Sequence, residues 1–320
     1  MKTIFIFTAS WGNGHNTAAE GLKDREEEKG NRVKIFDMAA VSWGAKIFSK
    51  SWKFVSERPF LWKWIYRLGN NKTPNFLLRW LLRKSFLGFL KQTFSHHLPD
   101  AIFVTNSLFS EVIDEALTKK VPKTVFLTDY YEPHFFWTWG KSVRIVCLDH
   151  HAKEYLQKHI PKRNYHVSPF PLPRRIEKVG AYSPAETRVL REKWGVAPEV
   201  PVFTFFFHHF LFGNEIEIFW KHWETHRNKA EYLVLTGKNE KFFKNKMAPF
   251  PEIHILPWVD DMSEMYAITD FAVGKAGGAL IGECQALKIP LEIYAALPGH
   301  EEANQIYWQS SSSLISSRLN

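Results

Sequence analysis

Two glycine-containing segments place polar side chains directly after apolar runs, where a ligand could bind. In the first, "TASWGNGHN", the residues Gly12, Asn13, Gly14 and His15 follow the apolar run Thr3–Phe7. Glycine at 12 and 14 predicts a turn with positive φ whose backbone approaches a ligand closely, and a histidine can accept a proton near neutral pH. Because the third glycine of a dinucleotide fingerprint is missing, a structural turn with a capping histidine is the alternative.

The second segment, "VGKAGGALIGE", follows an apolar run that ends at Val273. The backbone N–H groups of Gly277 and Gly278, the positive end of a helix dipole and the Lys275 ammonium together suit a diphosphate. Glu283 lies on the same predicted helix, where it can accept hydrogen bonds from ribose hydroxyls. A plain turn of an α/β protein is the weaker alternative.

The elements that must position these residues are strands and helices in alternation. Short runs rich in Val, Ile and Phe alternate with longer amphipathic stretches, which is typical of parallel βαβ structure. The strands expected are 3–7, 32–36, 101–105, 124–127 and 144–147, and then 202–207, 232–235, 253–256, 271–273 and 291–294. Two such series predict an α/β protein of two Rossmann-like domains facing a cleft, with ligands at the carboxyl ends of the strands.

Prolines and basic residues mark the predicted boundary between these domains. The stretch "SPFPLPRRIEKVGAYSP" predicts a linker at 168–185, between an N-terminal domain at 1–167 and a C-terminal domain at 186–320. The chain ends in "SSSSLISSRLN", which has little to bury. We therefore expect no closing helix there, and a C-terminal domain that is truncated or poorly ordered at its end.

Composition indicates a globular chain with an anionic partner. The 320 residues are 45% hydrophobic and carry a formal net charge of +9, which favours nucleic acid, a phosphorylated substrate or an anionic membrane surface. The two cysteines, Cys147 and Cys284, lie inside apolar runs, which favours buried thiols in a reducing cytoplasm. The sequence shows neither a signal peptide nor an apolar run long enough to span a membrane.

The positive charge is concentrated between Val41 and Ser95, where eleven Lys and Arg residues accompany one acid, Glu57. Tryptophans and phenylalanines recur there at helical spacing beside the bases, as in an amphipathic helix at a membrane interface. Packing of the aromatics in the core and a nucleic-acid surface are the alternatives, and no nucleic-acid-binding motif is present. We expect peripheral attachment to the cytoplasmic face of the cell membrane, through Lys46, Lys50, Trp52, Lys53, Trp62, Lys63 and Trp64.

The chain resembles the diacylglycerol glycosyltransferases, which comprise the monogalactosyldiacylglycerol synthases and the processive diacylglycerol β-glucosyltransferases, with a more distant likeness to the N-acetylglucosaminyltransferase that forms lipid II. The resemblance rests on six motifs in this order: "TASWGNGH", "PDAIFVTNS", "FLTDYYEPHFFW", "LTGKNE", "LPWVDDMSEMYAITDFAVGKAGG" and "LPGHEEAN". It implies a GT-B fold with an N-terminal acceptor domain and a C-terminal UDP-sugar domain. The implied activity is inverting transfer of a hexose from UDP-glucose or UDP-galactose to diacylglycerol, without a metal or cofactor.

The resemblance also assigns roles to residues of this chain. It places His15 at the reaction centre and Asp129 on the same cleft, and either could remove the proton from the acceptor hydroxyl. It places the uracil on 256–259 and the diphosphate and ribose on the glycine turn and Glu283, while Asp260 and Asp261 are predicted to cap a helix and not to bind a metal. The expected nucleotide-sugar residues are Trp258, Val259, Lys275, Ala276, Gly277, Gly278, Glu283, Glu301, Glu302 and Asn304; the expected acceptor loop contains Gly12, Asn13, Gly14 and His134.

Some stretches depart from the family pattern. In "FTFFFHHFLFGNE", 203–215, bulky side chains that include Phe206 and Phe207 stand where a glycine-containing loop is usual. Leu280 replaces a small hydroxyl residue, and "SPFPLPR" moves an expected arginine to Arg174. Two alternatives therefore stay open: a GT-B protein that binds nucleotide or membrane but transfers poorly, and a transferase for a polyprenyl-linked acceptor.

Overall fold

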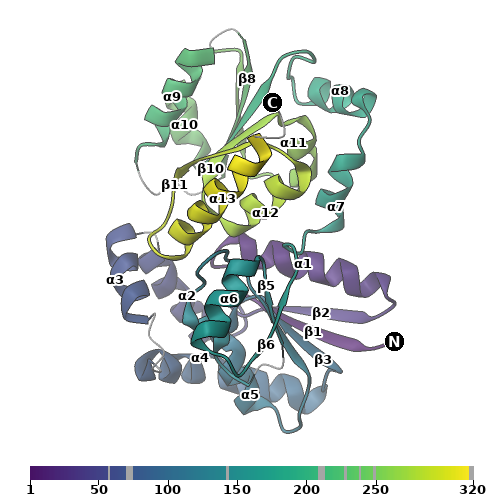
Figure 1. Ribbon diagram of the computed structural model, residues 1–320, viewed down its shortest axis with the longest axis vertical. Coiled ribbons are helices and arrows are strands. Elements are labelled where there is room, and N and C mark those ends of the chain that lie inside the picture. The colour runs from purple at the N-terminus through teal and green to yellow at the C-terminus, as the bar shows by residue number, and fades with distance from the viewer. Residues whose placement is uncertain are drawn as a thin grey trace. The chain divides into compact units, whose positions relative to one another are not determined.

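The computed structural model describes residues 1–56, 58–69, 75–141, 144–207, 213–226, 229–237, 239–247 and 250–316. The chain divides into two compact units (Figure 1): unit 1 is Met1–Pro173 with Leu297–Asn320, and unit 2 is Arg174–Ala296. Each unit is built on one parallel sheet with helices packed against it. The predicted pair of Rossmann-like domains is therefore confirmed.

Unit 1 contains a six-stranded sheet in the order β2-β1-β3-β4-β5-β6, in which every pair is parallel. Ile4 and Ile6 of the first strand pack against Ala19 and Leu22 of helix α1, because a parallel sheet is covered by helices and its strands are apolar on both faces. The strands are β1 (Thr3–Thr8), β2 (Arg32–Asp37), β3 (Ala101–Val104), β4 (Lys123–Phe126), β5 (Arg144–Cys147) and β6 (Asn164–Val167), and α1 is Asn13–Glu28.

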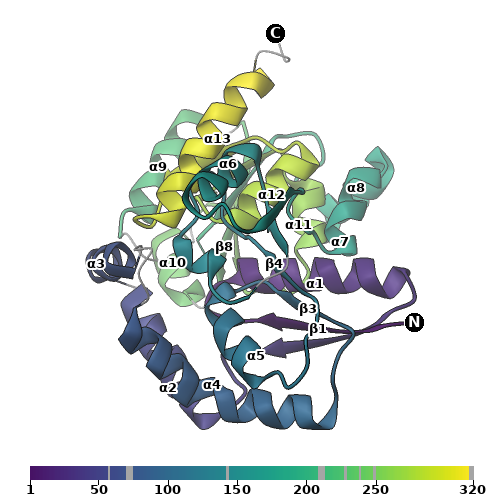
Figure 2. The ribbon, with the colours of Figure 1, turned by 60° about the horizontal axis from the view of Figure 1, so that its bottom comes forward.

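Three further helices follow β2: α2 (Trp43–Ser56), α3 (Pro59–Gly69) and α4 (Phe76–His96). Figure 2 shows α2 and α4 on one side of the sheet, and α4 packs on both α2 and α5 (Ser110–Ala116). Helix α4 buries Leu82, Phe86, Leu90 and Phe94, which recur every four residues on one face. The remaining elements of the first segment are the short helices η1 (Ser107–Phe109) and η2 (Phe135–Thr138) and the helix α6 (His150–His159).

The C-terminal segment returns to unit 1 as helix α13 (His300–Ser316). The backbone N–H of Tyr130 donates to Asn304 Oδ1 at 2.7 Å, and the rings of Tyr130 and Tyr307 stack at 4.3 Å. The expectation that no closing helix follows is therefore wrong, and so is a C-terminal domain that runs to residue 320. Both of these contacts come from the first half of the helix.

Unit 2 contains a five-stranded parallel sheet in the order β11-β10-β7-β8-β9. It begins at Arg174, so more than half of the predicted linker is folded into helices of this unit. Its strands are β7 (Val202–Phe206), β8 (Glu231–Gly237), β9 (Ile253–Pro257), β10 (Phe271–Lys275) and β11 (Leu291–Ala295). Its helices are α7 (Arg174–Glu177), η3 (Lys178–Ala181), α8 (Pro184–Lys193), α9 (Glu215–His226), α10 (Glu240–Met247), α11 (Met262–Ile268) and α12 (Gly278–Leu287).

All ten predicted strands are present, with ends that shift by no more than two residues. Strand β6 was not predicted, because its sequence "NYHV" is an edge strand with only two apolar residues. Among the helices of the described residues, none is both long and apolar enough to cross a bilayer.

Candidate active site

The predicted glycine loop lies where the strand order of unit 1 reverses, between β1 and β3, which is where open α/β sheets bind ligands. Gly12 caps α1 with φ −171°, which is extended backbone open to any residue, and Gly14 lies within the helix. The expectation of positive φ at these glycines is therefore wrong. A Cβ added to Gly12 would meet no atom within 4 Å, so this glycine leaves open space at the start of α1.

Side chains from neighbouring elements fix this loop. The backbone N–H and hydroxyl of Ser10 donate to the two carboxylate oxygens of Asp37 at 3.0 and 2.7 Å, and Asn16 Nδ2 donates to the Ser10 hydroxyl at 2.8 Å. Trp11 donates through Nε1 to the Ser49 hydroxyl at 2.9 Å. The loop that precedes His15 is thus held by β2 and α2 as well as by its own helix.

His15, on helix α1, is held in a single tautomer by Thr105, which directly follows β3. Its Nδ1 lies 2.7 Å from the carbonyl oxygen of Thr105 and 3.2 Å from the hydroxyl of Thr128. A carbonyl oxygen can only accept a hydrogen bond, so Nδ1 carries the proton and Nε2 carries the lone pair. In the part of the chain that the structure describes, no hydrogen bond reaches Nε2, which leaves this nitrogen able to accept a proton.

Burial lowers the pKa of His15 from its usual 6.5, because the charged imidazolium loses water. The charge of Asp129 and the hydrogen bond to Thr105 oppose this shift, and the neighbouring His300 adds to it. His15 is therefore neutral at pH 7, the state in which a histidine acts as a base.

Trp137 lies between the Asp129 carboxylate and His15. The side chain of Asp129 is 8% exposed, and its Oδ2 accepts a hydrogen bond from Trp137 Nε1 at 2.9 Å. The Trp137 ring lies 6.1 Å from the His15 ring. The structure thus brings together the two predicted catalytic residues, which are far apart in sequence, and supplies Trp137 between them, a contact that the sequence does not indicate.

His134, predicted to belong to the acceptor loop, is buried and hydrogen-bonded to the backbone. The backbone N–H of Phe136 donates to its Nδ1 at 3.1 Å, so its Nε2 carries the proton and lies 3.3 Å from the carbonyl oxygen of Tyr66. Burial lowers the pKa of His134 to about 3. Both ring nitrogens have a backbone partner, and contact of this residue with an acceptor stays a prediction.

The three polar residues predicted to contact a sugar, Glu301, Glu302 and Asn304, stabilise the start of α13 in unit 1. Glu301 accepts from the N–H of Leu297 and Glu302 accepts from that of Gly299, both at 2.8 Å. Asn304 is fully buried and accepts from Tyr130, as described above. These contacts involve one carboxylate oxygen of each glutamate and the amide oxygen of Asn304, and the binding of a sugar by these residues stays a prediction.

The same segment adds His300, which the sequence analysis did not select. Gly299 has φ +95°, and a Cβ there would lie 2.3 Å from Tyr66 Cε1, so only glycine fits. Trp62 Nε1 donates to the carbonyl of Pro298 at 3.1 Å, and the His300 ring lies 5.6 Å from the Trp62 ring. The only sequence signal for His300 is its place directly after a Pro-Gly turn. A cavity of about 250 Å³ lies there, lined by Lys63, Tyr66, Arg67, Pro298, Gly299 and Glu302.

In unit 2 the strand order reverses between β7 and β10, and the predicted Lys275–Gly278 turn follows β10 there. The amide of Ala276 donates to the carbonyl of Ala295 at 2.9 Å, and that of Gly277 donates to Lys275 at 2.7 Å, so neither is free to bind a phosphate. The remaining donors are the first amides of α12, which have no acceptor within their own helix. The Lys275 ammonium lies 3.9 Å from where a Gly277 Cβ would be, beside this helix start.

Glu283 is buried on α12, with 8% of its surface exposed. Its Oε2 accepts a hydrogen bond from the hydroxyl of Tyr266 on α11. Burial raises the pKa of Glu283 to about 7, and the Tyr266 hydrogen bond and the charge of Arg175 oppose that rise. Arg175 also lies 3.6 Å from the Asp261 carboxylate. The arginine near this site is therefore Arg175 and not the expected Arg174, which pairs with Glu177 at 3.0 Å.

The atypical stretch after β7 is only partly described, since 208–212 lie outside the described residues. Phe207 is fully buried and stacks on Phe243 at 5.6 Å in the core of unit 2. Phe206 points to the other face of the sheet, where it stacks on Tyr266 at 5.7 Å. The unusual Leu280 packs against Gly274, where a Cβ would come within 2.4 Å of it.

The predicted uracil segment follows β9. Trp258 is 52% exposed and donates from Nε1 to Asp260 Oδ1 at 2.8 Å, and Val259 is half-buried. Asp261 accepts a hydrogen bond from the N–H of Ser263 at 2.9 Å, which confirms it as the cap of α11.

The basic, aromatic segment has one buried face and one exposed face. Trp62 is 7% exposed and Trp52 packs between Trp11 and Trp62, so the structure removes Trp62 from any surface that could touch a membrane. Lys46, Lys50, Lys53 and Trp64 are exposed and Lys63 is half-buried. The exposed large apolar side chains of α2, α3 and α4, named here together the apolar face of unit 1, are Trp43, Ile47, Phe54, Phe60, Trp64, Ile65, Phe76, Leu77, Trp80 and Leu81.

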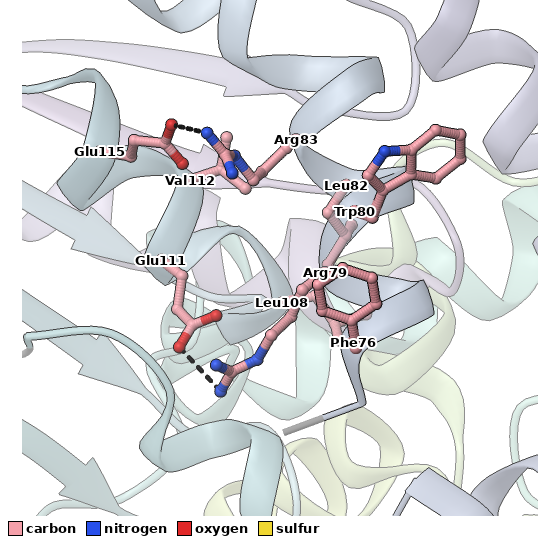
Figure 3. Close-up of a pocket in the computed structure, with 9 residues that line it drawn as sticks. All are labelled: Phe76, Arg79, Trp80, Leu82, Arg83, Leu108, Glu111, Val112 and Glu115. Atoms are coloured by element: carbon pink, nitrogen blue, oxygen red, sulfur yellow. Dashed lines mark hydrogen bonds and ion pairs between the residues drawn. The ribbon is translucent and has the colours of Figure 1, made fainter.

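A cavity of about 280 Å³ opens on this face between α4 and α5. Figure 3 shows that its walls carry two ion pairs, Arg79 with Glu111 and Arg83 with Glu115. Two of the eleven bases are thus paired with acids of α5. The other bases among the described residues of this segment are Lys46, Lys50, Lys53, Arg58, Lys63, Arg67, Lys84 and Lys91.

The chain is similar to several known proteins. A family model described as monogalactosyldiacylglycerol (MGDG) synthase matches residues 15–172. The uncharacterized glycosyltransferase YkoN of Bacillus subtilis is 25% identical over 324 residues, which cover 95% of this chain and 81% of YkoN. The processive diacylglycerol beta-glucosyltransferase of Bacillus licheniformis is 23% identical over 328 residues, which cover 98% of this chain and 82% of that protein.

Among solved structures, UGT89C1 of Arabidopsis thaliana, complexed with UDP-L-rhamnose, matches with a TM-score of 0.63 at 12% identity, over 96% of this chain and 83% of that one. At this identity the likeness concerns the fold alone. The expected GT-B fold is confirmed.

Proposed function

Because the chain belongs to the family of diacylglycerol glycosyltransferases, we propose that it transfers a hexose from a UDP-sugar to diacylglycerol with inversion at the anomeric carbon. The relatives named above supply the acceptor class. The observation that carries the proposal is the state of His15, a neutral histidine with its lone pair on Nε2 beside the carboxylate of Asp129.

Unit 1 supplies the acceptor chemistry of the proposal. His15 Nε2 accepts the proton of the acceptor hydroxyl while the hydroxyl oxygen bonds to the anomeric carbon and the bond from that carbon to the diphosphate breaks. The charge that forms on the imidazole is stabilised by Asp129 and by the Thr105 carbonyl at Nδ1. The structure thus favours His15 as the base, with Asp129 in an electrostatic role.

Unit 2 supplies the donor chemistry. Lys275 and the first amides of α12 stabilise the negative charge that develops on the departing UDP, because a helix start and a cation favour phosphate oxygens. Glu283 accepts the ribose hydroxyls, and Trp258 and Val259 contact the uracil. The absence of an acidic side chain from the first turn of α12 supports this assignment.

We further propose that the apolar face of unit 1 lies on an anionic membrane surface, which is where diacylglycerol resides. Its aromatic side chains enter the interface, and the lysines of α2 and α3 attract anionic lipids, each by about 1 kcal/mol. The choice of a membrane over a protein partner rests on this combination of tryptophan, phenylalanine and lysine on exposed helix faces.

Transfer is tested with labelled UDP-glucose and UDP-galactose on vesicles of anionic phospholipid that contain diacylglycerol. We expect a labelled glycolipid with β configuration from one of the donors, and a loss of at least about 100-fold in His15→Ala, since general bases contribute about 10²–10⁴-fold. His159→Ala is the matched control. The Nδ1 of His159 is also hydrogen-bonded to a backbone carbonyl, that of Tyr155 at 2.7 Å, and this residue lies outside the site. Labelled lipid from neither donor contradicts the proposal, and nucleotide binding without transfer indicates a binding protein.

Membrane attachment is tested by co-sedimentation with the same vesicles. Phe60→Ala and Trp64→Ala remove side chains that are 78% and 58% exposed, so we expect weaker binding, and added salt should weaken the wild type as well. Phe242→Ala, an exposed aromatic of unit 2, is the control and should bind as the wild type does. Equal loss in all three variants contradicts the assignment of this face.

A further inference from the structure

Three buried side chains from three separate elements form a row at the carboxyl end of the unit 2 sheet. Phe206 ends β7, Tyr266 lies on α11 and Glu283 lies on α12, with exposed fractions of 9%, 3% and 8%. The Phe206 and Tyr266 rings stack at 5.7 Å with an interplanar angle of 24°, and the Tyr266 hydroxyl donates to Glu283 Oε2. The donation has one direction because the ionised carboxylate only accepts.

We propose that Tyr266 is a positioning residue that holds the Glu283 carboxylate in the orientation that binds the ribose hydroxyls of the nucleotide, and that Phe206 holds Tyr266 in place. This inference rests on the proposed function, because it assigns a UDP-sugar to unit 2. It also gives a role to the first bulky residue of the atypical stretch after β7.

The chemistry of a carboxylate explains why such a residue is needed. A glutamate side chain has several rotatable bonds, and both hydroxyls of a ribose must meet its oxygens at the same time. A carboxylate has about four sites that accept hydrogen bonds, so one bond from Tyr266 leaves sites for two hydroxyls. Fixing the group beforehand removes the ordering cost from nucleotide binding.

Strand alternation explains how Phe206 comes to this position. Successive side chains of a strand point to opposite faces, and Phe205 and Phe207 both lie in the apolar core of unit 2. Phe206 therefore points to the face that carries Tyr266.

The test compares the binding of UDP and of 2′,3′-dideoxy-UDP by calorimetry at pH 7.5, with the full chain as wild type, Tyr266→Phe, Phe206→Leu and Tyr232→Phe. The ratio of the two affinities measures how well the site recognises the ribose hydroxyls. Tyr232→Phe is the matched control, because Tyr232 is a fully buried tyrosine of the same unit whose hydroxyl has no hydrogen-bond partner among the described residues.

We expect the wild type to prefer UDP, Tyr266→Phe to reduce that preference about tenfold, and Phe206→Leu to reduce it by a smaller factor, since a hydrogen bond to a charged group is worth about one to two powers of ten. The control should keep the wild-type ratio. An unchanged ratio in Tyr266→Phe, or an equal loss in the control, overturns the positioning role. A wild type that binds UDP without preference also overturns it but leaves nucleotide binding intact, whereas a wild type that does not bind UDP refutes the proposed function itself.

Discussion

Replacing Glu283 by glutamine should make the protein more resistant to unfolding at alkaline pH. Burial raises the pKa of Glu283 from 4.5 to about 7 in the folded chain, so between these values the folded state holds a proton that the unfolded state releases. The free energy of unfolding therefore falls as pH rises through this window, by ~3.4 kcal/mol for a difference of ~2.5 units. Glutamine retains an oxygen that can accept the Tyr266 hydroxyl but has no charge, so it removes this loss.

The assay is urea unfolding of wild type and Glu283→Gln at pH 5 and pH 8, followed by tryptophan fluorescence and by hydrogen exchange in α12. At pH 5 little of the loss has developed, so we expect the difference in unfolding free energy between the two proteins to grow by ~2.5 kcal/mol towards pH 8. Glu186→Gln is the control, because hydrogen bonds from Ser183 lower the pKa of Glu186 from its usual 4.5. Its contribution is lost only as pH falls below this range, so this variant should differ from the wild type by a similar amount at pH 5 and pH 8. A difference between Glu283→Gln and wild type that is the same at both pH values would refute the reasoning.

The remaining predictions concern binding, catalysis and docking. UDP-glucose should bind about tenfold more tightly at pH 8 than at pH 6, because Glu283 must be ionised to accept two hydroxyls and its pKa is about 7. In Glu283→Gln, calorimetry should give the same affinity at both pH values. Asp129→Asn should lower kcat/KM at least about tenfold and move the acidic limb of its pH profile to lower pH, because the Asp129 charge raises the pKa of His15; an unmoved limb contradicts the electrostatic role. Gly299→Ala should lower the stability of unit 1 by about 2 kcal/mol or more, because its Cβ would overlap Tyr66 at 2.3 Å; an unchanged melting temperature contradicts that clash.

The expected trend for Asp129 also separates the two candidates for the base. The indole of Trp137 donates to Asp129 Oδ2, which ties this carboxylate to the protein, whereas the Thr105 carbonyl orients His15 with its lone pair at Nε2. If Asp129 were the base, Asp129→Asn would remove activity at every pH and His15→Ala would have the smaller effect. The pH profiles of the two variants therefore decide between them.

Local sequence was sufficient to predict ten of the eleven strands of the described residues and the position of the glycine turn after β10. A strand buried on both faces is a short apolar run, and the ends of ten such runs were predicted to within two residues because polar or glycine residues follow them directly. The C-terminal helix of unit 1 could not be predicted in this way. Serines neither favour nor exclude a helix strongly, so the sequence of the tail does not show that α13 docks on Tyr130, more than 170 residues away.

The helices rich in aromatic residues show the same limit. Trp62 and Trp64 are two residues apart with similar neighbours, yet Trp62 is 7% exposed and Trp64 is 58% exposed. A rotation of about 200° along the helix separates them, but apolar residues occupy both faces, so periodicity alone does not show which face is covered. The hydrogen bond from Trp62 to the carbonyl of Pro298 shows that the face of α3 that carries Trp62 is the covered one.

The sequence by itself therefore determined the fold class, the two sheets and the residue types that could act on a UDP-sugar. Only the tertiary structure decided what state those residues are in. Thr105 sets the tautomer of His15 from 90 residues away, Trp137 holds Asp129, and burial beneath Tyr266 sets the pKa of Glu283. The physical reason is that tautomer, orientation and pKa depend on which atoms lie within a few ångströms and on how much water is excluded, and neither is a property of the local sequence.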